Sequence, residues 1–278
     1  VNGIRKFGRI NPIIIGKHGG KNNVDKLLAS LDRTKLLTKK IEKQKPDLLV
    51  SFCSPEASRV AYGLGIPHIA FSDSPHAKAV MKLSLPYVKK LLTPWIIPKS
   101  DFKGFGIYSR DIIHYRAIDA GVIIKNYKKR KGVKPSKNKT ILIRPEESEA
   151  AYVNKKSMTK NIIKKIVTEF PDQEKIVLSR YKKQTDELKK VFGGEIKILS
   201  KPVNGKEILN YIDCFIGSGG TMTAEAGLLG IPTISLNTIP NRIEDYLVKN
   251  KIVVRSESPN RISREVFQVL NNENIVKK

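Results

Sequence analysis

Short apolar runs alternate with amphipathic segments along most of this 278-residue chain, and this alternation limits the folds that it can adopt. Between two such runs, residues 154–169 place Ile162, Ile163 and Ile166 on one face of a helix. Short apolar strands that alternate with such helices form parallel sheets covered on both faces and joined by right-handed crossovers. The apolar runs of the second half are 140–144, 175–179, 196–199, 213–217, 231–236 and 252–254.

The first half follows the same pattern less completely. Its predicted strands are 11–16, 47–52 and 66–71, and its longest predicted helix is 22–45. The sequence "LGIPHIAFSDSP" at 64–75 aligns without a gap with "LGIPTISLNTIP" at 229–240. In both copies a glycine ends a helix and Ile-Pro opens a strand. The two halves therefore read as two similar domains.

The fold class that follows is α/β, with two doubly wound, Rossmann-like domains facing a cleft. We predict an acceptor-side domain at 1–124, a basic linker at 125–139 and a nucleotide-binding domain at 140–278. The linker carries eight basic residues, no acid, and the glycine and proline typical of an exposed connection. We also expect the first domain to lack an N-terminal βαβ unit of about 40 residues.

A net charge of +26 predicts attraction to anionic partners. Nucleic acid is not the expected partner, because the linker offers only Tyr127 for stacking on bases. Segment 81–99 mixes apolar and aromatic side chains with four lysines, which leaves two alternatives: peripheral contact with an anionic membrane, or a core helix and strand. The sequence shows neither a secretory signal nor an apolar run near the ~20 residues that a membrane span needs. Its two cysteines fit a reducing compartment. We therefore expect a cytoplasmic location.

The most informative motif is "GSGGTMTAEAGLLGIPTISL" at 217–236, which reads as a glycine turn between a strand and a helix. A helix N-terminus leaves backbone N–H groups unpaired, and glycines let a phosphate approach them. Ser218 and Thr221 add hydroxyl donors, and Glu225 follows one turn later, where it can accept from a ribose diol. The alternative is a tight turn in which Ser218 is only an N-cap. The motif is neither G-x-G-x-x-G nor a P-loop.

"SGGTMTAEAGLLGIPTISL" resembles the donor-nucleotide motif of GT-B glycosyltransferases, with the glutamate spacing of the lipid-linked UDP-N-acetylglucosamine transferase of peptidoglycan synthesis. The non-hydrolysing UDP-N-acetylglucosamine 2-epimerases share the architecture, but their glutamate falls one residue earlier. With "GKHGG" and "KPDLLVSFCSPEASRVAYGLGIPHIAFSDSPHA", most of the chain is similar to an uncharacterised GT-B-like family of unknown function.

The resemblance implies roles for particular residues. Ser218, Gly219, Gly220 and Thr221 would hold the diphosphate, and Glu225 the ribose. Loops that follow other strands of the second domain would complete the site, which adds Arg144, Arg180 and, as a contact to the base, Asn204. A structural role for each arginine stays open. The substrate would be a nucleoside-diphosphate sugar, UDP-linked, and no metal or other cofactor is required, because helix dipoles and arginines can stabilise the leaving diphosphate.

In the first domain, loops after predicted strands carry the candidates for a general base, His18, Asp73 and His76, with Glu56 a weaker candidate. Asp73 and His76 have structural alternatives at the start of a helix. The preferred function is transfer of a hexosyl or N-acetylhexosaminyl group from a UDP-sugar to a lipid-linked or saccharide acceptor. One alternative is a UDP-sugar 2-epimerase, although the loops "CSPE" and "SDSPH" of this chain do not match the loops of that family. The other is a non-catalytic protein that binds nucleotides or polyanions.

Overall fold

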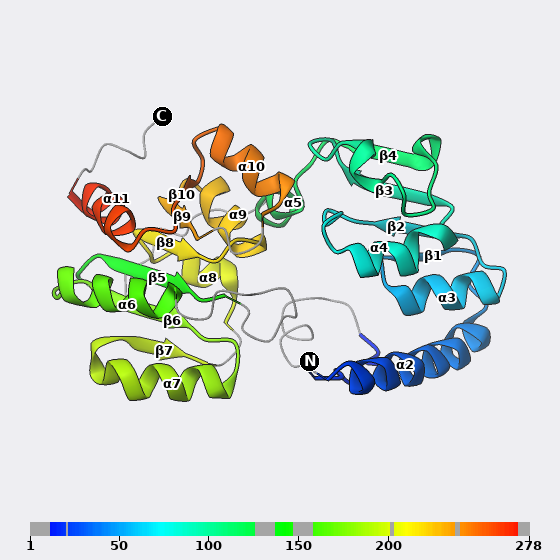
Figure 1. Cartoon of the computed structure of the whole chain (residues 1–278), viewed down its shortest axis with the longest axis horizontal. Coiled ribbons are helices and arrows are strands. Elements are labelled where there is room, and N and C mark those ends of the chain that lie inside the picture. The colour runs from blue at the N-terminus through cyan, green and yellow to red at the C-terminus, as the bar shows by residue number, and fades with distance from the viewer. Residues whose placement is uncertain are drawn as a thin grey trace. The chain divides into compact units, whose positions relative to one another are not determined.

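The computed structural model describes residues 12–20, 22–125, 137–146, 158–200, 203–236 and 240–271. The chain divides into two compact units, Val1–Ala117 and Ile118–Lys278. Each unit is an α/β structure with its own sheet (Figure 1).

The first unit holds a parallel sheet with the strand order β1-β2-β3-β4. Strands that follow one another in the sequence are also neighbours in the sheet, so each connection leads to the next strand toward the same edge of the sheet. The strands are β1 (Leu49–Ser51), β2 (His68–Phe71), β3 (Lys90–Pro94) and β4 (Ile112–Tyr115), and the helices are α2 (Asn23–Gln44), α3 (Pro55–Gly63) and α4 (Lys78–Ser84), with 3-10 turns at Leu85–Tyr87, Lys99–Phe102 and Ser109–Asp111.

Local capping explains where the first helices begin. The Val24 N–H donates to Asn22 Oδ1 at 2.7 Å, so α2 starts at its predicted place. Ser54 caps α3 in the same way. The strand predicted at 11–16 is wrong for residues 12–16, which form no strand and leave Ile13 and Ile14 exposed. An apolar run becomes a strand only beside a hydrogen-bonding neighbour, and no described strand pairs with this one.

Segment 81–99 forms the end of α4, the turn Leu85–Tyr87 and β3. Leu85, Leu91 and Ile97 are fully buried, so the core-helix-and-strand alternative describes this segment. Within the described residues, no helix combines the length and apolar character needed to cross a bilayer.

The second unit has a parallel sheet with the order β10-β9-β8-β5-β6-β7. Its strands are β5 (Thr140–Arg144), β6 (Glu174–Leu178), β7 (Lys197–Leu199), β8 (Cys214–Gly217), β9 (Thr233–Ser235) and β10 (Val254–Arg255), and its helices are α5 (Asp119–Ile124), α6 (Met158–Glu169), α7 (Lys182–Phe192), α8 (Gly205–Leu209), α9 (Thr221–Leu228), α10 (Arg242–Lys249) and α11 (Pro259–Asn271).

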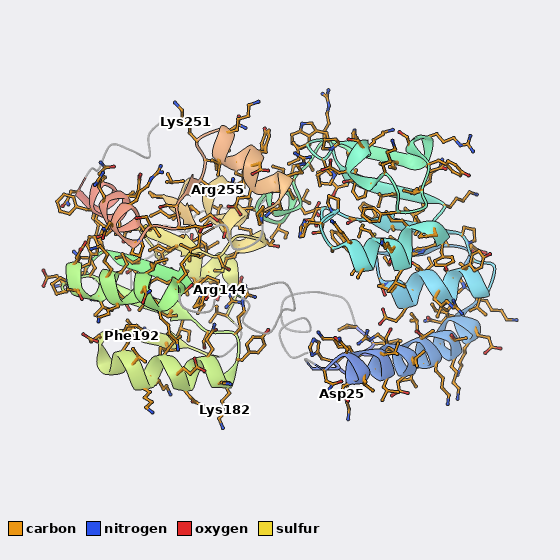
Figure 2. The ribbon with its side chains drawn as sticks, viewed as in Figure 1. Asp25, Arg144, Lys182, Phe192, Lys251 and Arg255 are labelled. Atoms are coloured by element: carbon orange, nitrogen blue, oxygen red, sulfur yellow. The ribbon has the colours of Figure 1, made fainter. Side chains whose placement is uncertain are left out.

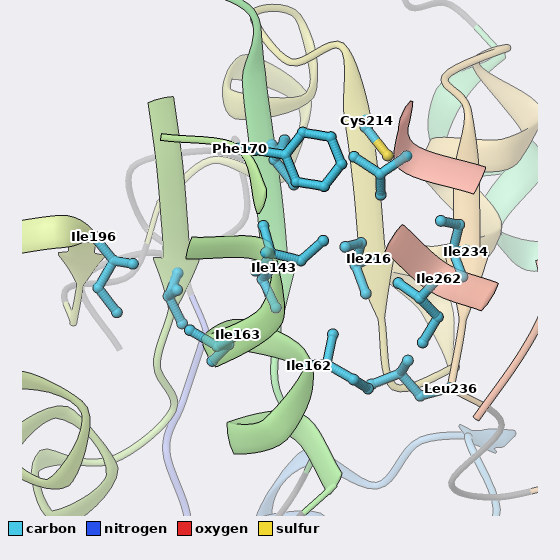
Figure 3. Packing of buried hydrophobic residues seen from close by; sticks show 14 of the residues in the cluster. Ile143, Ile162, Ile163, Phe170, Ile196, Cys214, Ile216, Ile234, Leu236 and Ile262 are labelled. Carbon is cyan, nitrogen blue, oxygen red and sulfur yellow. The ribbon is translucent and has the colours of Figure 1, made fainter. Parts of the chain in front are cut away.

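Successive side chains of the central strands point to opposite faces of this sheet, and both faces are covered. Ile143 and Ile216 pack on one face with Ile162 and Ile262, which α6 and α11 contribute (Figure 3). Leu142 and Phe215 belong to a separate cluster on the other face, with side chains of α8 and α9. This two-sided burial confirms the doubly wound α/β fold predicted for this half.

The division between the units precedes α5. The sequence pattern assigns residues 118–124 to the first domain, whereas α5 packs against α9, and a Cβ added to Gly121 would lie 3.8 Å from Leu228 Cδ1. Ala120 and Ile124 are buried there, which explains why this short helix joins the second unit. Residues 126–136 of the predicted linker lie outside the described residues.

Candidate functional site

The sheet of the second unit changes direction between β5 and β8. The chain runs from β5 outward to β6 and β7, then returns to β8 and runs outward the other way to β9 and β10. Arg144 at the end of β5 pairs in register with Gly217 at the end of β8. In open α/β sheets, ligands bind beside the carboxyl ends of strands at such a switch point. Figure 2 shows Arg144 at the tip of β5.

The predicted glycine turn leaves this switch point and enters α9. Gly219 has φ +100° and Gly220 has φ +85°, a region that favours glycine. Gly220 is the N-cap of α9 and provides no side-chain cap for the first turn. The alternative in which Ser218 caps the helix is therefore wrong, because the Ser218 hydroxyl donates instead to the Pro145 carbonyl at 3.4 Å. Backbone N–H groups at an uncapped helix start, together with the helix dipole, suit an anion.

Both predicted arginines gather at the same edge of the sheet. Arg180 Nε lies 3.5 Å from the Pro145 carbonyl that also accepts from Ser218. Arg144 Nη1 donates to the Leu178 carbonyl at 3.2 Å, across the ends of β5 and β6. These bonds anchor the two side chains on backbone carbonyls and concentrate positive charge beside the glycine turn.

Glu225 and the Asn204 loop also come together. A Cβ added to Gly205 would lie 3.6 Å from Glu225 Oε2, and Asn204 Oδ1 caps α8 by accepting from the Lys206 N–H at 3.1 Å. Burial raises the pKa of the half-buried Glu225 carboxyl, and the Lys206 charge only partly offsets this. The site therefore holds a desolvated carboxylate one helical turn after Thr221, as the motif predicts.

Sequence reasoning missed two side chains at this site. The motif gives no role to Lys206, two residues after Asn204, although its charge lowers the pKa of Glu225. Glu244 was also missed, because a glutamate three residues after Asn241 has the spacing of a helix capping box. In the structure Glu244 is buried and its carboxyl lies against Gly219.

Asp73 and His76 lie on the loop after β2, as predicted, whereas His18 precedes α2 and follows no described strand. His18 is exposed, and its Nδ1 accepts from the Gly20 N–H at 3.1 Å. Asp73 Oδ1 accepts from the Ser74 hydroxyl at 2.7 Å. Partial burial lowers the pKa of His76, and the charge of Asp73 opposes this shift, so the two residues lie close enough to interact.

Glu56, the weaker candidate, has a structural role. It is buried, accepts from the hydroxyls of Ser30 and Ser54, and pairs with Arg33, so it ties α2 to α3. Arg33 Nη2 also donates to the Lys17 carbonyl at 3.0 Å, which holds the "GKHGG" loop on α2.

Two α/β units with parallel sheets, one with a glycine turn at its switch point, define a protein with a GT-B type of fold. Residues 4–278 match the family described as "Protein of unknown function (DUF354)", so the chain belongs to that family. This confirms the resemblance of most of the chain to a GT-B-like family of unknown function.

Three known proteins illustrate the relationship. The chain is 29% identical over 284 residues to an uncharacterized protein of Methanocaldococcus jannaschii, covering 88% of this chain and 80% of that protein. It is similar to UDP-GlcNAc 2-epimerase from Neisseria meningitidis bound to UDP-GlcNAc, with a TM-score of 0.69 at 14% identity over 89% of this chain and 74% of the other. It is also similar to the glycotransferase of kitacinnamycin, with a TM-score of 0.53 at 12% identity over 95% of this chain and 79% of the other. At these identities the solved structures show the fold alone.

Proposed function

We propose that the second unit binds a nucleoside-diphosphate sugar, UDP-linked, with the diphosphate at the start of α9. The observation that carries this proposal is the uncapped glycine turn at the switch point, with the desolvated Glu225 one turn further along the helix. Arg144 and Arg180 supply positive charge for the diphosphate, and Ser218 and Thr221 supply hydroxyls. Glu225 accepts from the ribose diol, and Asn204 contacts the base.

For the reaction, we propose transfer of the sugar to a lipid-linked or saccharide acceptor. The spacing from Ser218 to Glu225 supports a transferase, since it matches the transferase motif rather than the epimerase motif. His76 is the preferred base, because partial burial keeps its imidazole neutral and ready to accept a proton. His18 is less suited, because its Nδ1 already accepts a hydrogen bond, which leaves the proton of the neutral ring on Nε2.

A second candidate, UDP-sugar 2-epimerisation, has support from the likeness to the Neisseria meningitidis enzyme. The two reactions leave different products. Incubation with UDP-GlcNAc, followed by chromatography and NMR, distinguishes free UDP, which transfer or hydrolysis releases, from a second UDP-sugar, which epimerisation forms. A protein that binds UDP-GlcNAc and leaves it unchanged with every acceptor tried would be a binding protein.

The binding test compares Glu225→Gln with Glu207→Gln, a substitution of an exposed glutamate on the neighbouring α8. Removing a charge-assisted hydrogen bond should cost about 1.5–3 kcal/mol, which weakens UDP binding roughly tenfold to a hundredfold. Titration calorimetry with UDP should show this loss for Glu225→Gln and unchanged affinity for Glu207→Gln. Equal affinities for the wild type and Glu225→Gln would refute the ribose assignment, and no binding of UDP or UDP-sugars to the wild type would refute the proposed function.

A further inference from the structure

A buried carboxyl group lies directly behind the glycine turn. Glu244, on α10, is 3% exposed, and its Oε1 accepts from Arg255 Nε at 3.2 Å. Its other oxygen, Oε2, has no hydrogen-bond partner among the described residues. A Cβ added to Gly219 would lie 2.8 Å from this Oε2, so the loop backbone rests against the carboxyl group. A buried polar atom without a partner is uncommon and calls for a missing proton, water or ligand.

Few charges stabilise Glu244 as an anion. Arg255 of β10 is the cation beside it, but Arg255 Nη2 also binds Asp245 Oδ1 at 2.7 Å, so one guanidinium serves two carboxylates. The Ser235 hydroxyl of β9 lies close enough to the carboxyl group to favour its charged form by hydrogen bonding, although Oε2 accepts no bond of good geometry, whereas Asp245 on α10 itself opposes the charged form. On the side of α9, residues 217–223 contain no ionisable side chain. Burial outweighs the favourable contacts and raises the pKa of Glu244.

A diphosphate at the start of α9 brings further negative charge to the other side of the same loop. Neighbouring like charges favour the neutral form of an acid, especially where water is excluded. Arg255 cannot compensate fully because Asp245 already shares it. A proton on Oε2 removes the repulsion and with it the cost of burying a charged oxygen that has no hydrogen-bond partner among the described residues.

We propose that Glu244 takes up one proton from solvent when a nucleoside-diphosphate sugar binds at the glycine turn. An O–H bond forms at Oε2, the carboxylate becomes a neutral carboxyl group, and no other bond changes. Glu244 thus acts through the loop as a proton-linked positioning residue, and affinity rises as pH falls. This inference rests on the proposed function of the same site.

The test is titration calorimetry with UDP-glucose, whose esterified diphosphate does not itself titrate near neutral pH. Measurements in buffers with different ionisation enthalpies give the number of protons taken up at each pH. The wild type should take up close to one proton where the pH lies between the pKa values of the free and bound states, and its affinity should change by up to about tenfold per pH unit there. Uptake near zero from about pH 5 to pH 8 would overturn the proposal without any variant.

Glu244→Gln tests whether Glu244 is the group that takes up the proton, because glutamine has the shape of the neutral acid but cannot bind a proton near neutral pH. It should bind UDP-glucose without proton uptake, with an affinity that no longer depends on pH and that is at least as high as the wild type at neutral pH. The comparison variant is Asp245→Asn, which removes the charge that raises the Glu244 pKa and leaves Arg255 to Glu244 alone, so it should keep the uptake but shift it to lower pH. Proton uptake that persists in Glu244→Gln would refute the role of this residue.

Two further outcomes separate the possible failures. If Glu244→Gln does not fold, Glu225→Gln decides between the two acids of the site whose pKa burial raises: loss of the uptake in that variant overturns the assignment to Glu244, and its retention supports it. If the wild type binds no nucleotide sugar at any pH, the proposed function itself fails. Binding without proton uptake leaves the proposed function intact and removes only this inference.

Discussion

Alanine at position 219 would place a methyl group 2.8 Å from Glu244 Oε2, a buried atom that cannot move into solvent. Alanine at the next position, 220, would meet no atom within 4 Å. Both glycines have positive φ, +100° at Gly219 and +85° at Gly220. The two substitutions therefore share the backbone strain, and only Gly219→Ala adds a steric clash.

The expected costs follow from these two terms. Backbone strain of this kind costs on the order of 1–3 kcal/mol at either position. Overpacking against a buried side chain adds about 1–3 kcal/mol, so Gly219→Ala should be less stable than Gly220→Ala by about that amount. For a unit of this size, each kcal/mol lowers the midpoint of thermal unfolding by about 2–4 °C.

The assay must follow the second unit. The single tryptophan, Trp95, lies in the first unit, so its fluorescence reports the wrong half of the chain. Far-UV circular dichroism and amide hydrogen exchange in α9 report the second. Adding Glu244→Ala to Gly219→Ala removes the clashing carboxyl group, and a double-mutant cycle should recover most of the extra cost. Equal losses for the two alanine variants, or no recovery in the double variant, would show that the carboxyl group does not lie against the loop.

Three more predictions concern other parts of the chain. Burial raises the pKa of Glu56, but hydrogen bonds from its backbone N–H and from Ser30, together with the Arg33 charge, lower it more. The wild type should therefore lose stability as pH falls below about 4.5. Acid unfolding followed by Trp95 fluorescence should show a weaker pH dependence for Glu56→Gln. Burial raises the pKa of Cys53 to about 11 and of Cys214 to about 12, so thiol reagents should label neither before unfolding. Retention on anionic vesicles, if it occurs, should fall steeply between low and moderate salt, and binding that persists at high salt would refute an electrostatic attraction.

The sequence predicts this fold well where one pattern controls both secondary structure and burial. The runs at 140–144 and 213–217 each have an apolar centre, Ile141–Ile143 and Cys214–Ile216, and both become central strands with helices over each face. The run at 11–16 has similar composition but its described residues, 12–16, form no strand, because strand formation depends on a neighbour that composition does not reveal. Residues 118–124 show the same limit, since packing against α9 decides their unit.

The candidate site is predictable to the extent that its residues follow strands of one sheet. Arg180 and Ser218 meet at the Pro145 carbonyl, and Arg144 pairs in register with Gly217, because parallel strands bring their carboxyl ends to the same edge. Glu244 could not be found in this way. It comes from a helix, and only the tertiary structure reveals that its side chain turns inward to the glycine turn.

The structure also separates the reasons for the three glycines, which the motif alone treats as one phosphate loop. A side chain at Gly217 would clash with Phe215 and Thr223, whose nearest atoms would lie 2.4 Å from the added Cβ. One at Gly219 would clash with Glu244. Gly220 alone among them is exposed, and a Cβ added there would meet no atom within 4 Å, so its φ of +85° rather than packing favours glycine, and only there does the loop leave space for an approaching ligand. The motif thus combines one glycine that leaves room for a ligand with two that the packing of the loop requires, and Gly220→Ala should affect binding while its loss of stability stays limited to the backbone strain of about 1–3 kcal/mol.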